Sequence, residues 1–193
     1  MRALISLLAM VLALSACNAP GPSFKNADIT GADYGRDFAL TDHSGRVRAL
    51  ADFRGKVVVL FFGYTRCPDV CPTALAEFKA VREQLGEDGK RVQVLFVTID
   101  PERDTPKLLA SYVLAFDPSF LGLYGDRAAT AKVAREFKVF YQKVPGKAPG
   151  SYTMDHTAGS YVFDPQGRLR LFARLGNAAD LAADIKLLLR APG

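Results

Sequence analysis

Residues 57–72 read VVVLFFGYTRCPDVCP, and this stretch decides the fold of the chain. It starts with an apolar run of the length of a buried strand, continues through a short turn and ends in a cysteine pair, Cys67 and Cys71. Pro72 follows directly, and proline is favoured at the first helical position, where its missing N–H leaves no hydrogen bond unmade. The stretch therefore predicts a strand, a turn and two cysteines at or beside the N-terminus of a helix.

A cysteine pair at such a position suits redox or metal chemistry. The helix macrodipole and the free N–H groups of the first turn stabilise a thiolate, and so lower the pKa of a thiol there. Strand, turn, cysteine pair and helix, in this order, are the layout of a thioredoxin-like redox site. Three residues separate Cys67 from Cys71, where that layout usually has two. The additional residue favours an arrangement in which both thiolates face one metal ion, and a site for disulfide exchange alone does not need it.

Length and composition predict one domain and no nucleic-acid partner. The chain has 193 residues, of which 49% are hydrophobic, which is enough for one well-packed domain and too little for two. Its net charge is +5, and the lysines and arginines are scattered rather than gathered in a basic block. The chain therefore lacks the electrostatic footprint of a nucleic-acid-binding protein.

The first residues predict a targeting signal. Residues 1–16 have a positive start at Arg2 and an apolar stretch that is too short for an ordinary membrane span. Residues 14–17, LSAC, resemble a bacterial lipobox, in which the cysteine, here Cys17, is lipidated and becomes the new N-terminus. The alternative is an ordinary signal peptide with an incidental cysteine. In either case the protein is expected to be exported to the bacterial cell envelope, and the lipobox predicts that it is lipid-anchored to a membrane at the periplasmic or extracytoplasmic face.

This location restricts what the remaining cysteines can do. The chain has three cysteines, so a lipidated Cys17 leaves only Cys67 and Cys71 as thiols. In an oxidising compartment such a pair forms a disulfide, a metal site, or both in turn.

The rest of the chain predicts an α/β fold. Residues 17–35 are rich in Pro, Gly, Asn and Asp and are expected to form the lipidated N-terminus and a flexible tether, followed by one domain at 36–193. Alternating strands and helices with a late antiparallel hairpin predict a mixed sheet flanked by helices, with an N-terminal β-hairpin extension. The expected elements are a hairpin at 38–50, strands at 57–62, 92–99 and 121–124, helices at 72–85, 105–116, 126–138 and 177–190, a loop at 144–152 and a hairpin at 161–172.

The chain has two histidines, and they have different expected roles. His43 lies in a polar hairpin turn and is expected to be an exposed turn residue. His156 lies in a loop just before the hairpin at 161–172, and in a thioredoxin-like sheet that loop lies beside the cysteine-bearing end of the helix. Two thiolates and an imidazole are a soft ligand set suited to copper. Structural zinc usually takes four protein ligands, and the sequence offers no obvious fourth.

With these residues in place, the chain resembles the Sco/SenC family. Three blocks carry the resemblance and occur in the order of the family: residues 57–73, the DPERDT block at 100–105 and the DHT block at 155–157. The first block is highly specific, whereas Asp-His-Thr alone would be weak. The similarity runs from about Phe38 to Arg190.

The resemblance implies both a ligand set and a function. It implies a thioredoxin-like fold in which copper, as Cu(I), Cu(II) or both, is bound by Cys67, Cys71 and His156, with the two cysteines as the redox disulfide. It also implies delivery of copper to the dinuclear CuA site of cytochrome c oxidase, or reduction of the cysteines of that site. The expected partner is the CuA-bearing subunit or another cuproprotein. Family members are often held to a membrane by an N-terminal helix, and a lipidated Cys17 would take its place here.

Three neighbouring features have two interpretations each. Asp155 is expected to hold His156 in one tautomer, and the alternative is a turn aspartate that faces solvent. The segment at 100–104 follows a strand end, where such folds place functional sites, but it also suits a strand stop and a helix cap. Met154 offers a thioether ligand or an apolar anchor for its loop.

Three functions compete at this point. A copper metallochaperone uses all three ligands and is not an enzyme, whereas a thiol–disulfide oxidoreductase would use the thiolate pair alone to reduce a cuproprotein partner. His156 separates the two, because a pure reductase does not need it. A peroxidase is the third hypothesis, since residues 70–73 superficially resemble peroxiredoxins. Those enzymes have Thr or Ser three residues before the reactive cysteine, and Pro68 stands there in this chain.

Overall fold

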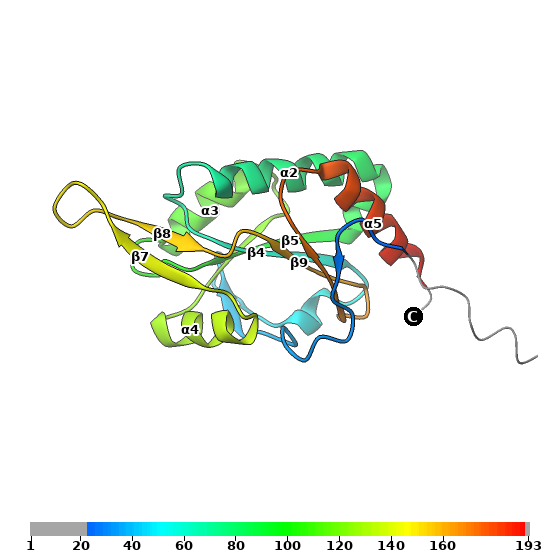
Figure 1. Ribbon diagram of the computed structural model, residues 1–193, viewed down its shortest axis with the longest axis horizontal. Coiled ribbons are helices and arrows are strands. Elements are labelled where there is room, and N and C mark those ends of the chain that lie inside the picture. Colours follow the sequence, from blue (N-terminus) through cyan, green and yellow to red (C-terminus); the bar gives the residue numbers. More distant parts are fainter. Residues whose placement is uncertain (1–22, 192–193) are drawn as a thin grey trace, which may run out of the picture.

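The computed structural model describes residues 23–191, and its centre is an eight-stranded mixed sheet with helices on both faces (Figure 1). Helices α2, α3 and α5 lie on one side of the sheet, and α4 lies on the other. The sheet has the strand order β1-β10-β9-β4-β5-β6-β2-β3. Its strands are β1 (Ala27–Asp28), β2 (Leu40–Asp42), β3 (Val47–Arg48), β4 (Val57–Gly63), β5 (Val92–Thr98), β6 (Leu121–Tyr124), β9 (Ser160–Phe163) and β10 (Leu169–Ala173). The helices are α2 (Val70–Leu85), α3 (Pro106–Leu114), α4 (Arg127–Glu136) and α5 (Ala178–Arg190), with short 3₁₀ turns at Leu50–Phe53 and Gly86–Arg91.

The two central strands explain why the sequence folds around residues 57–62. All residues of β4 and β5 are buried, and the two strands pair in parallel. Strands that are covered on both faces are apolar throughout rather than alternating, and both segments have this pattern. On its other side β4 pairs antiparallel with β9, so the sheet is mixed, as the sequence predicts.

The N-terminal hairpin is present and extends this sheet. Strand β2 pairs antiparallel with β3 and also with β6. The turn between β2 and β3 is organised by Asp42, which is buried and accepts hydrogen bonds from the Oγ of Ser44 (2.5 Å), the N–H of Arg46 (3.1 Å) and the Nε of Arg48 (2.7 Å). One buried carboxylate therefore fixes the hairpin.

His43 is not the exposed turn residue that the sequence predicts. Its backbone N–H donates to the carbonyl of Gly122 (2.8 Å), and its Nδ1 accepts from the N–H of Gly122 (3.1 Å). The side chain is half-buried. It extends the pairing of the hairpin to β6, so its role is structural.

Part of the predicted tether is packed against the domain. Strand β1 pairs antiparallel with β10. Beside it, the backbone N–H groups of Lys25 and Asn26 both donate to the carboxylate of Asp184, at 2.8 Å each, and Asp184 is fully buried in α5. The domain thus begins earlier than the predicted boundary at residue 36. The predicted signal peptide at 1–16 and the predicted lipidation site Cys17 lie outside the described residues.

The loop that the sequence predicts at 144–152 is present as the shorter segment 146–151, and it connects two strands that the sequence did not predict. Strands β7 (Tyr141–Pro145) and β8 (Tyr152–His156) pair antiparallel as an isolated two-stranded sheet. Only residues 146–151 connect them, and the hairpin projects at one end of the molecule (Figure 1). His156 is therefore the last residue of a strand and not part of a loop.

Within residues 23–191, no helix combines the length and the apolar character that crossing a membrane requires.

Candidate metal centre

The two cysteines lie where the central strand passes into helix α2. Strand β4 ends at Gly63, the N–H of Cys67 closes a turn onto the carbonyl of Tyr64 (3.2 Å), and α2 begins at Val70. Cys71 is therefore inside the first turn of the helix, and its N–H points at the Sγ of Cys67 (3.4 Å). The predicted position of the pair is confirmed, although the helix starts before Pro72 rather than at it.

The two sulfurs differ in their access to solvent. Cys67 is partly exposed, whereas Cys71 is fully buried. This burial raises the pKa of the Cys71 thiol far above its ordinary value, because a buried thiolate loses its hydration. From the helix macrodipole, the sequence analysis predicts a lowered thiol pKa. For Cys71 the effect of burial on the pKa is larger and has the opposite sign. Burial therefore favours the protonated form of the Cys71 thiol.

Gly63 allows this close packing. A Cβ atom at this position would lie 2.8 Å from the Sγ of Cys71 and 2.8 Å from the ring of Phe96. Any side chain here would displace the sulfur or the ring. The glycine at the end of β4 is therefore needed for the Cys71 sulfur to lie directly on the backbone of the strand.

His156 faces the cysteines from the opposite side. Its Nε2 lies 3.8 Å from the Sγ of Cys71, and its Nδ1 lies 2.9 Å from the carbonyl oxygen of Thr157. A carbonyl can only accept a hydrogen bond, so Nδ1 carries the proton and the lone pair of Nε2 faces the sulfur. Burial lowers the pKa of His156 and so favours the neutral imidazole, which is the form that binds metals.

Two aromatic rings hold the imidazole in place. The rings of Phe61 and Tyr64 meet the ring of His156 nearly edge-to-face, with centroids 6.1 and 6.2 Å away. Both residues belong to or follow the buried strand β4, so the core of the domain supports the histidine directly. Tyr64 and the carbonyl of Thr157 are parts of this site that sequence reasoning missed. For Tyr64, the only signal in the sequence was an aromatic residue in the turn before the cysteines.

The three predicted ligands lie together. The Sγ atoms of Cys67 and Cys71 and the ring nitrogen of His156 are all within 4.8 Å of one another. Cys67 and His156 border an open cleft of about 370 Å³, whose walls also include Pro68, Val70 and Ala158, whereas Cys71 is fully buried. One ion can therefore contact all three ligand atoms and can be reached from solvent.

Asp155 does not have the role that the sequence predicts. It is exposed and lies opposite Gln142 in the hairpin, and among residues 23–191 no hydrogen bond joins it to His156. Neighbouring residues of a strand point to opposite faces, so the two side chains diverge. The carbonyl of Thr157 fixes the tautomer instead.

Met154 has the simpler of its two interpretations, and the segment at 100–104 supplies no metal ligand. Met154 is buried against the core, as expected for an apolar anchor. Asp100 follows β5 by two positions, after the strand has ended at Thr98. Thr105 caps α3, since its side chain accepts a hydrogen bond from the N–H of Leu108 (3.2 Å). The segment at 100–104 supplies no group to the metal-ligand cluster found among the described residues.

Comparison with known proteins shows to which family this chain is related. The family model described as SCO1/SenC matches residues 26–190. The mitochondrial SCO2 homolog of Bos taurus is 43% identical over 150 residues, which cover 77% of this chain and 56% of that protein. The human mitochondrial SCO1 homolog is 35% identical over 159 residues, covering 81% of this chain and 53% of that protein. The chain thus spans about half the length of the curated relatives that it matches.

Solved structures extend the likeness to the fold. The structure of Bradyrhizobium japonicum ScoI with copper bound has 44% sequence identity and a TM-score of 0.72, and the match covers 80% of this chain and 98% of that one. The solution structure of apo Sco1 from Thermus thermophilus has 43% identity and a TM-score of 0.74, covering 88% and 98%. The predicted α/β, thioredoxin-like fold is confirmed. Because the family model covers nearly all of the described residues, this chain belongs to the SCO1/SenC family.

Proposed function

We propose that this protein is a copper metallochaperone that delivers copper to the CuA site of cytochrome c oxidase, or prepares that site for it. The observation that carries the proposal is the cluster of Cys67, Cys71 and His156, whose ligand atoms lie within 4.8 Å of one another. The relative from Bradyrhizobium japonicum, which was solved with copper bound, supports the choice of metal.

The chemistry of the ligands also favours copper. Two thiolates and one neutral imidazole are a soft set that suits Cu(I), and the imidazole makes the site tolerant of Cu(II). Both sulfurs must lose their protons before they bind, so loading releases a proton from the buried Cys71 thiol. Neutral His156 needs no such step, because its Nε2 lone pair already faces the sulfur.

The different solvent exposure of the two cysteines determines the order in which the copper ligands are replaced during transfer. Cys67 is partly exposed and, with His156, borders the open cleft, whereas Cys71 is fully buried. An incoming ligand of the partner can therefore replace Cys67 or His156 first. Cys71 then holds the ion until the partner has supplied enough ligands of its own. Transfer proceeds by ligand exchange, and the ion is never released to water.

The same two sulfurs also support a second candidate function, reduction of a disulfide in a cuproprotein partner. The partly exposed Cys67 is the sulfur that a partner can reach, so its thiolate attacks the partner's disulfide and forms a mixed disulfide. The Cys71 sulfur then attacks the Cys67 sulfur, and the proton of the Cys71 thiol passes to the departing thiolate of the partner. The partner leaves as a dithiol, this protein is oxidised to the Cys67–Cys71 disulfide, and two electrons have passed to the partner.

The proposed place of action is the periplasmic or extracytoplasmic face of a membrane in the bacterial cell envelope. The lipobox-like residues 14–17 support export and lipidation of Cys17. A diacylated cysteine inserts two chains, and stable anchoring generally takes about two such signals.

One experiment in cells separates the two candidate functions. Strains carrying His156→Ala or Cys67→Ser are grown at limiting copper, and the activity of the copper oxidase is measured in their membranes. Copper delivery predicts that both strains lose oxidase and that added copper restores part of it in the His156→Ala strain. If the His156→Ala strain assembles oxidase normally while the Cys67→Ser strain fails, the function is reduction.

A further inference from the structure

The segment between β5 and α3, residues 100–104, touches both halves of the metal centre without supplying a ligand. We call this segment the brace. Three of its residues, Asp100, Arg103 and Asp104, have buried or nearly buried side chains: Asp100 is 1% exposed, Asp104 2% and the side chain of Arg103 16%. Charged groups are rarely buried without specific partners, so the contacts of these three side chains show which parts of the structure they hold in place.

One end of the brace grips the strand that ends in His156. The guanidinium of Arg103 lies 3.5 Å above the ring of Tyr152, and its Nη1 donates to the carbonyl of Tyr152 (2.9 Å). The hydroxyl of Tyr152 in turn donates to Asp100 (2.8 Å), which also accepts from the Nε of Arg103. Tyr152 is the first residue of β8, so the strand is fixed at the end opposite His156.

Arg103 also backs the histidine by a second route. Its guanidinium lies 5.9 Å from the centre of the Tyr64 ring, and the Tyr64 ring packs edge-to-face on His156. The same arginine thus contacts two rings, one at the start of the strand and one beside the ligand itself. A single planar cation can do this because guanidinium stacks on aromatic faces while it donates in its own plane.

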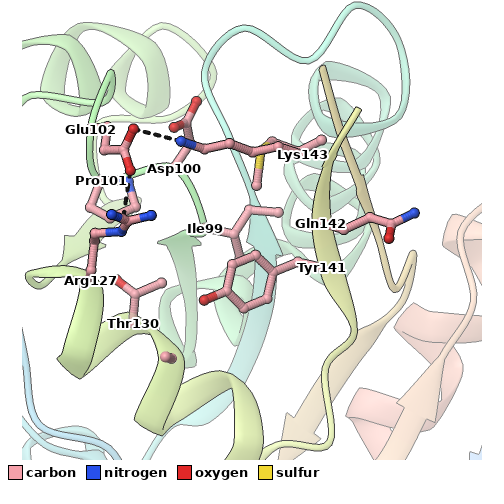
Figure 2. Close-up of a pocket in the computed structure, with 11 residues that line it drawn as sticks. Ile99, Asp100, Pro101, Glu102, Arg127, Thr130, Tyr141, Gln142 and Lys143 are labelled. Atoms are coloured by element: carbon pink, nitrogen blue, oxygen red, sulfur yellow. Dashed lines mark hydrogen bonds and ion pairs between the residues drawn. The ribbon is translucent and has the colours of Figure 1, made fainter. Parts of the chain in front are cut away.

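The neighbouring strand β7 is attached to the brace through Glu102. Its carboxylate pairs with Lys143 of β7 (2.6 Å) and with Arg127 of α4 (3.3 Å), and Figure 2 shows Glu102 between the two cations. A cavity of about 250 Å³ lies between the brace and β7, with Tyr141 on its far side. These ion pairs are exposed, so they add less than the contacts of Arg103.

The other end of the brace holds the turn that carries the cysteines. Asp104 accepts hydrogen bonds from the N–H and the Oγ1 of Thr65 (3.0 and 2.6 Å), and from the Oγ1 of Thr98 at the end of β5 (2.6 Å). Thr65 stands two positions before Cys67. A buried carboxylate therefore ties the cysteine turn to the central sheet.

The hairpin needs such support. It is a separate two-stranded sheet, and an isolated two-stranded hairpin is at best marginally stable in water. Without an attachment, the end of β8 would move relative to the cysteines on α2. Metal sites lose affinity when the groups that orient their ligands are removed.

We propose that Arg103 and Asp104 are positioning residues that set the spacing of the copper ligands, Arg103 by holding His156 and Asp104 by holding the turn of Cys67. The proposal rests on the proposed function, in which Cys67, Cys71 and His156 bind copper. One segment thereby fixes the positions of both His156 and the cysteine turn, although these ligands are far apart in the chain.

The histidine half is tested with Arg103→Lys in the full-length protein. Lysine keeps the charge but cannot stack on Tyr152 and donate to its carbonyl together, so the affinity for Cu(I), measured by competition with a chromophoric chelator, should fall about 10–100-fold. The midpoint potential of the Cys67–Cys71 disulfide should change far less than in Asp104→Ala, because Asp104 and not Arg103 is hydrogen-bonded to the turn that carries the cysteines. Arg127→Lys is the matched control, since Arg127 contacts Glu102 but neither Tyr64 nor Tyr152, and it should leave both quantities unchanged.

A double variant decides whether Arg103 acts through His156. The combination Arg103→Lys with His156→Ala should bind Cu(I) no more weakly than His156→Ala alone, because the residue that Arg103 positions is already gone. If the two losses add in full, or if Arg103→Lys alone has no effect while His156→Ala weakens binding, the positioning role is wrong. If His156→Ala alone leaves the affinity unchanged, the ligand assignment itself is wrong. Should Arg103→Lys fail to fold, Tyr152→Phe, which removes only the hydroxyl bound to Asp100, gives the same comparison with a smaller loss.

The cysteine half is tested with a pair of variants at Asp104. Asp104→Ala removes every acceptor from Thr65, so both the disulfide midpoint potential and the Cu(I) affinity should change. Asp104→Asn keeps an oxygen for the N–H of Thr65 and should restore most of both values. Because the two variants remove the same charge, equal effects would mean that charge rather than positioning is responsible, and would overturn this half of the proposal.

Discussion

The Sγ atom of Cys71 and the Nε2 atom of His156 lie 3.8 Å apart, although 85 positions separate the two residues in the chain. Since Nδ1 of His156 carries its proton toward Thr157, the Cys71 thiol can donate its own proton to Nε2. A weak hydrogen bond can therefore join two of the three candidate ligand atoms, and a bound copper ion would take the place of that proton.

His156→Ala should weaken Cu(I) binding by at least about 10–100-fold while the Cys67–Cys71 disulfide still forms and is still reduced. That range is the usual cost of removing a group that only orients a metal ligand, so removing a ligand should cost no less. Chelator competition measures the affinity, and thiol titration measures the disulfide. Asp155→Ala is the matched control, because Asp155 is exposed and is not joined to His156 by any hydrogen bond among the described residues. An equal loss in Asp155→Ala would contradict the site as described.

The oxidised protein, with Cys67 and Cys71 in a disulfide, should not bind Cu(I). Only thiolates are ligands, and a disulfide leaves His156 as the remaining donor. Metal analysis after desalting, on reduced and oxidised samples loaded in parallel, checks this. If both samples retain the same amount of copper, the sulfurs are not the ligands.

Alkylation should reach Cys67 well before Cys71. Cys67 is partly exposed, whereas Cys71 is fully buried and its thiol is held in the protonated form by burial. Because the thiolate is the nucleophile, we expect the rates with iodoacetamide to differ by at least about tenfold, as followed by peptide mass spectrometry. The difference should disappear in denaturant, and bound Cu(I) should protect both residues. Equal rates in the native protein would show that Cys71 is accessible.

Replacing Asp42 should destabilise the fold in a pH-dependent way. Burial by itself raises the pKa of Asp42, but the hydrogen bonds from Ser44, Arg48 and Arg46 outweigh it and hold the pKa well below its ordinary value of 3.8. The carboxylate therefore stabilises the fold above that value, and the contribution is lost as the pH falls below it. Asp42→Ala should lower the free energy of unfolding by about 2–3 kcal/mol at neutral pH.

The measurement is urea unfolding of wild type and Asp42→Ala between about pH 7 and pH 3. The difference between the two proteins should stay constant at the upper end and narrow at the lower end. A difference that is independent of pH over the whole range would mean that Asp42 acts by packing and not by its charge.

Cys17→Ser should release the protein from membranes or block its processing, and should leave copper binding unchanged. The lipobox-like residues 14–17 are the basis of this expectation. Fractionation of cells followed by intact-mass measurement of the N-terminus checks it. A mature chain that begins at an unmodified residue other than Cys17 would rule out the lipid.

Much of this site could be predicted because its signals are local. The apolar run before the cysteines gave strand β4, and the spacing of the pair together with the following proline gave the start of α2. His156 was found through the resemblance and the chemistry of the ligands. Its position in a loop was wrong, because β7 and β8 are short, partly exposed strands whose polar residues and flanking glycines and prolines resemble a loop.

The remaining errors follow from long-range contacts. Once His156 is placed on a strand, Asp155 must point away from it, which a loop would not require. The raised pKa of Cys71 depends on how deeply the sulfur lies over Gly63, and a helix-terminus argument does not include that burial. The early start of the domain depends on Asp184, which lies 159 positions from Lys25. No local pattern could connect those residues.

The hydrogen bonds from Lys25 and Asn26 to Asp184 limit how far the domain can lie from a lipid attached to Cys17. They place the start of the described chain beside α5, at the end of the long axis opposite the β7–β8 hairpin (Figure 1). With a lipid on Cys17, the stretch to Lys25 spans at most about 28 Å even when fully extended. The proposed lipid anchor would therefore keep the α5 end of the domain within that distance of the bilayer, at the end of the molecule opposite the β7–β8 hairpin.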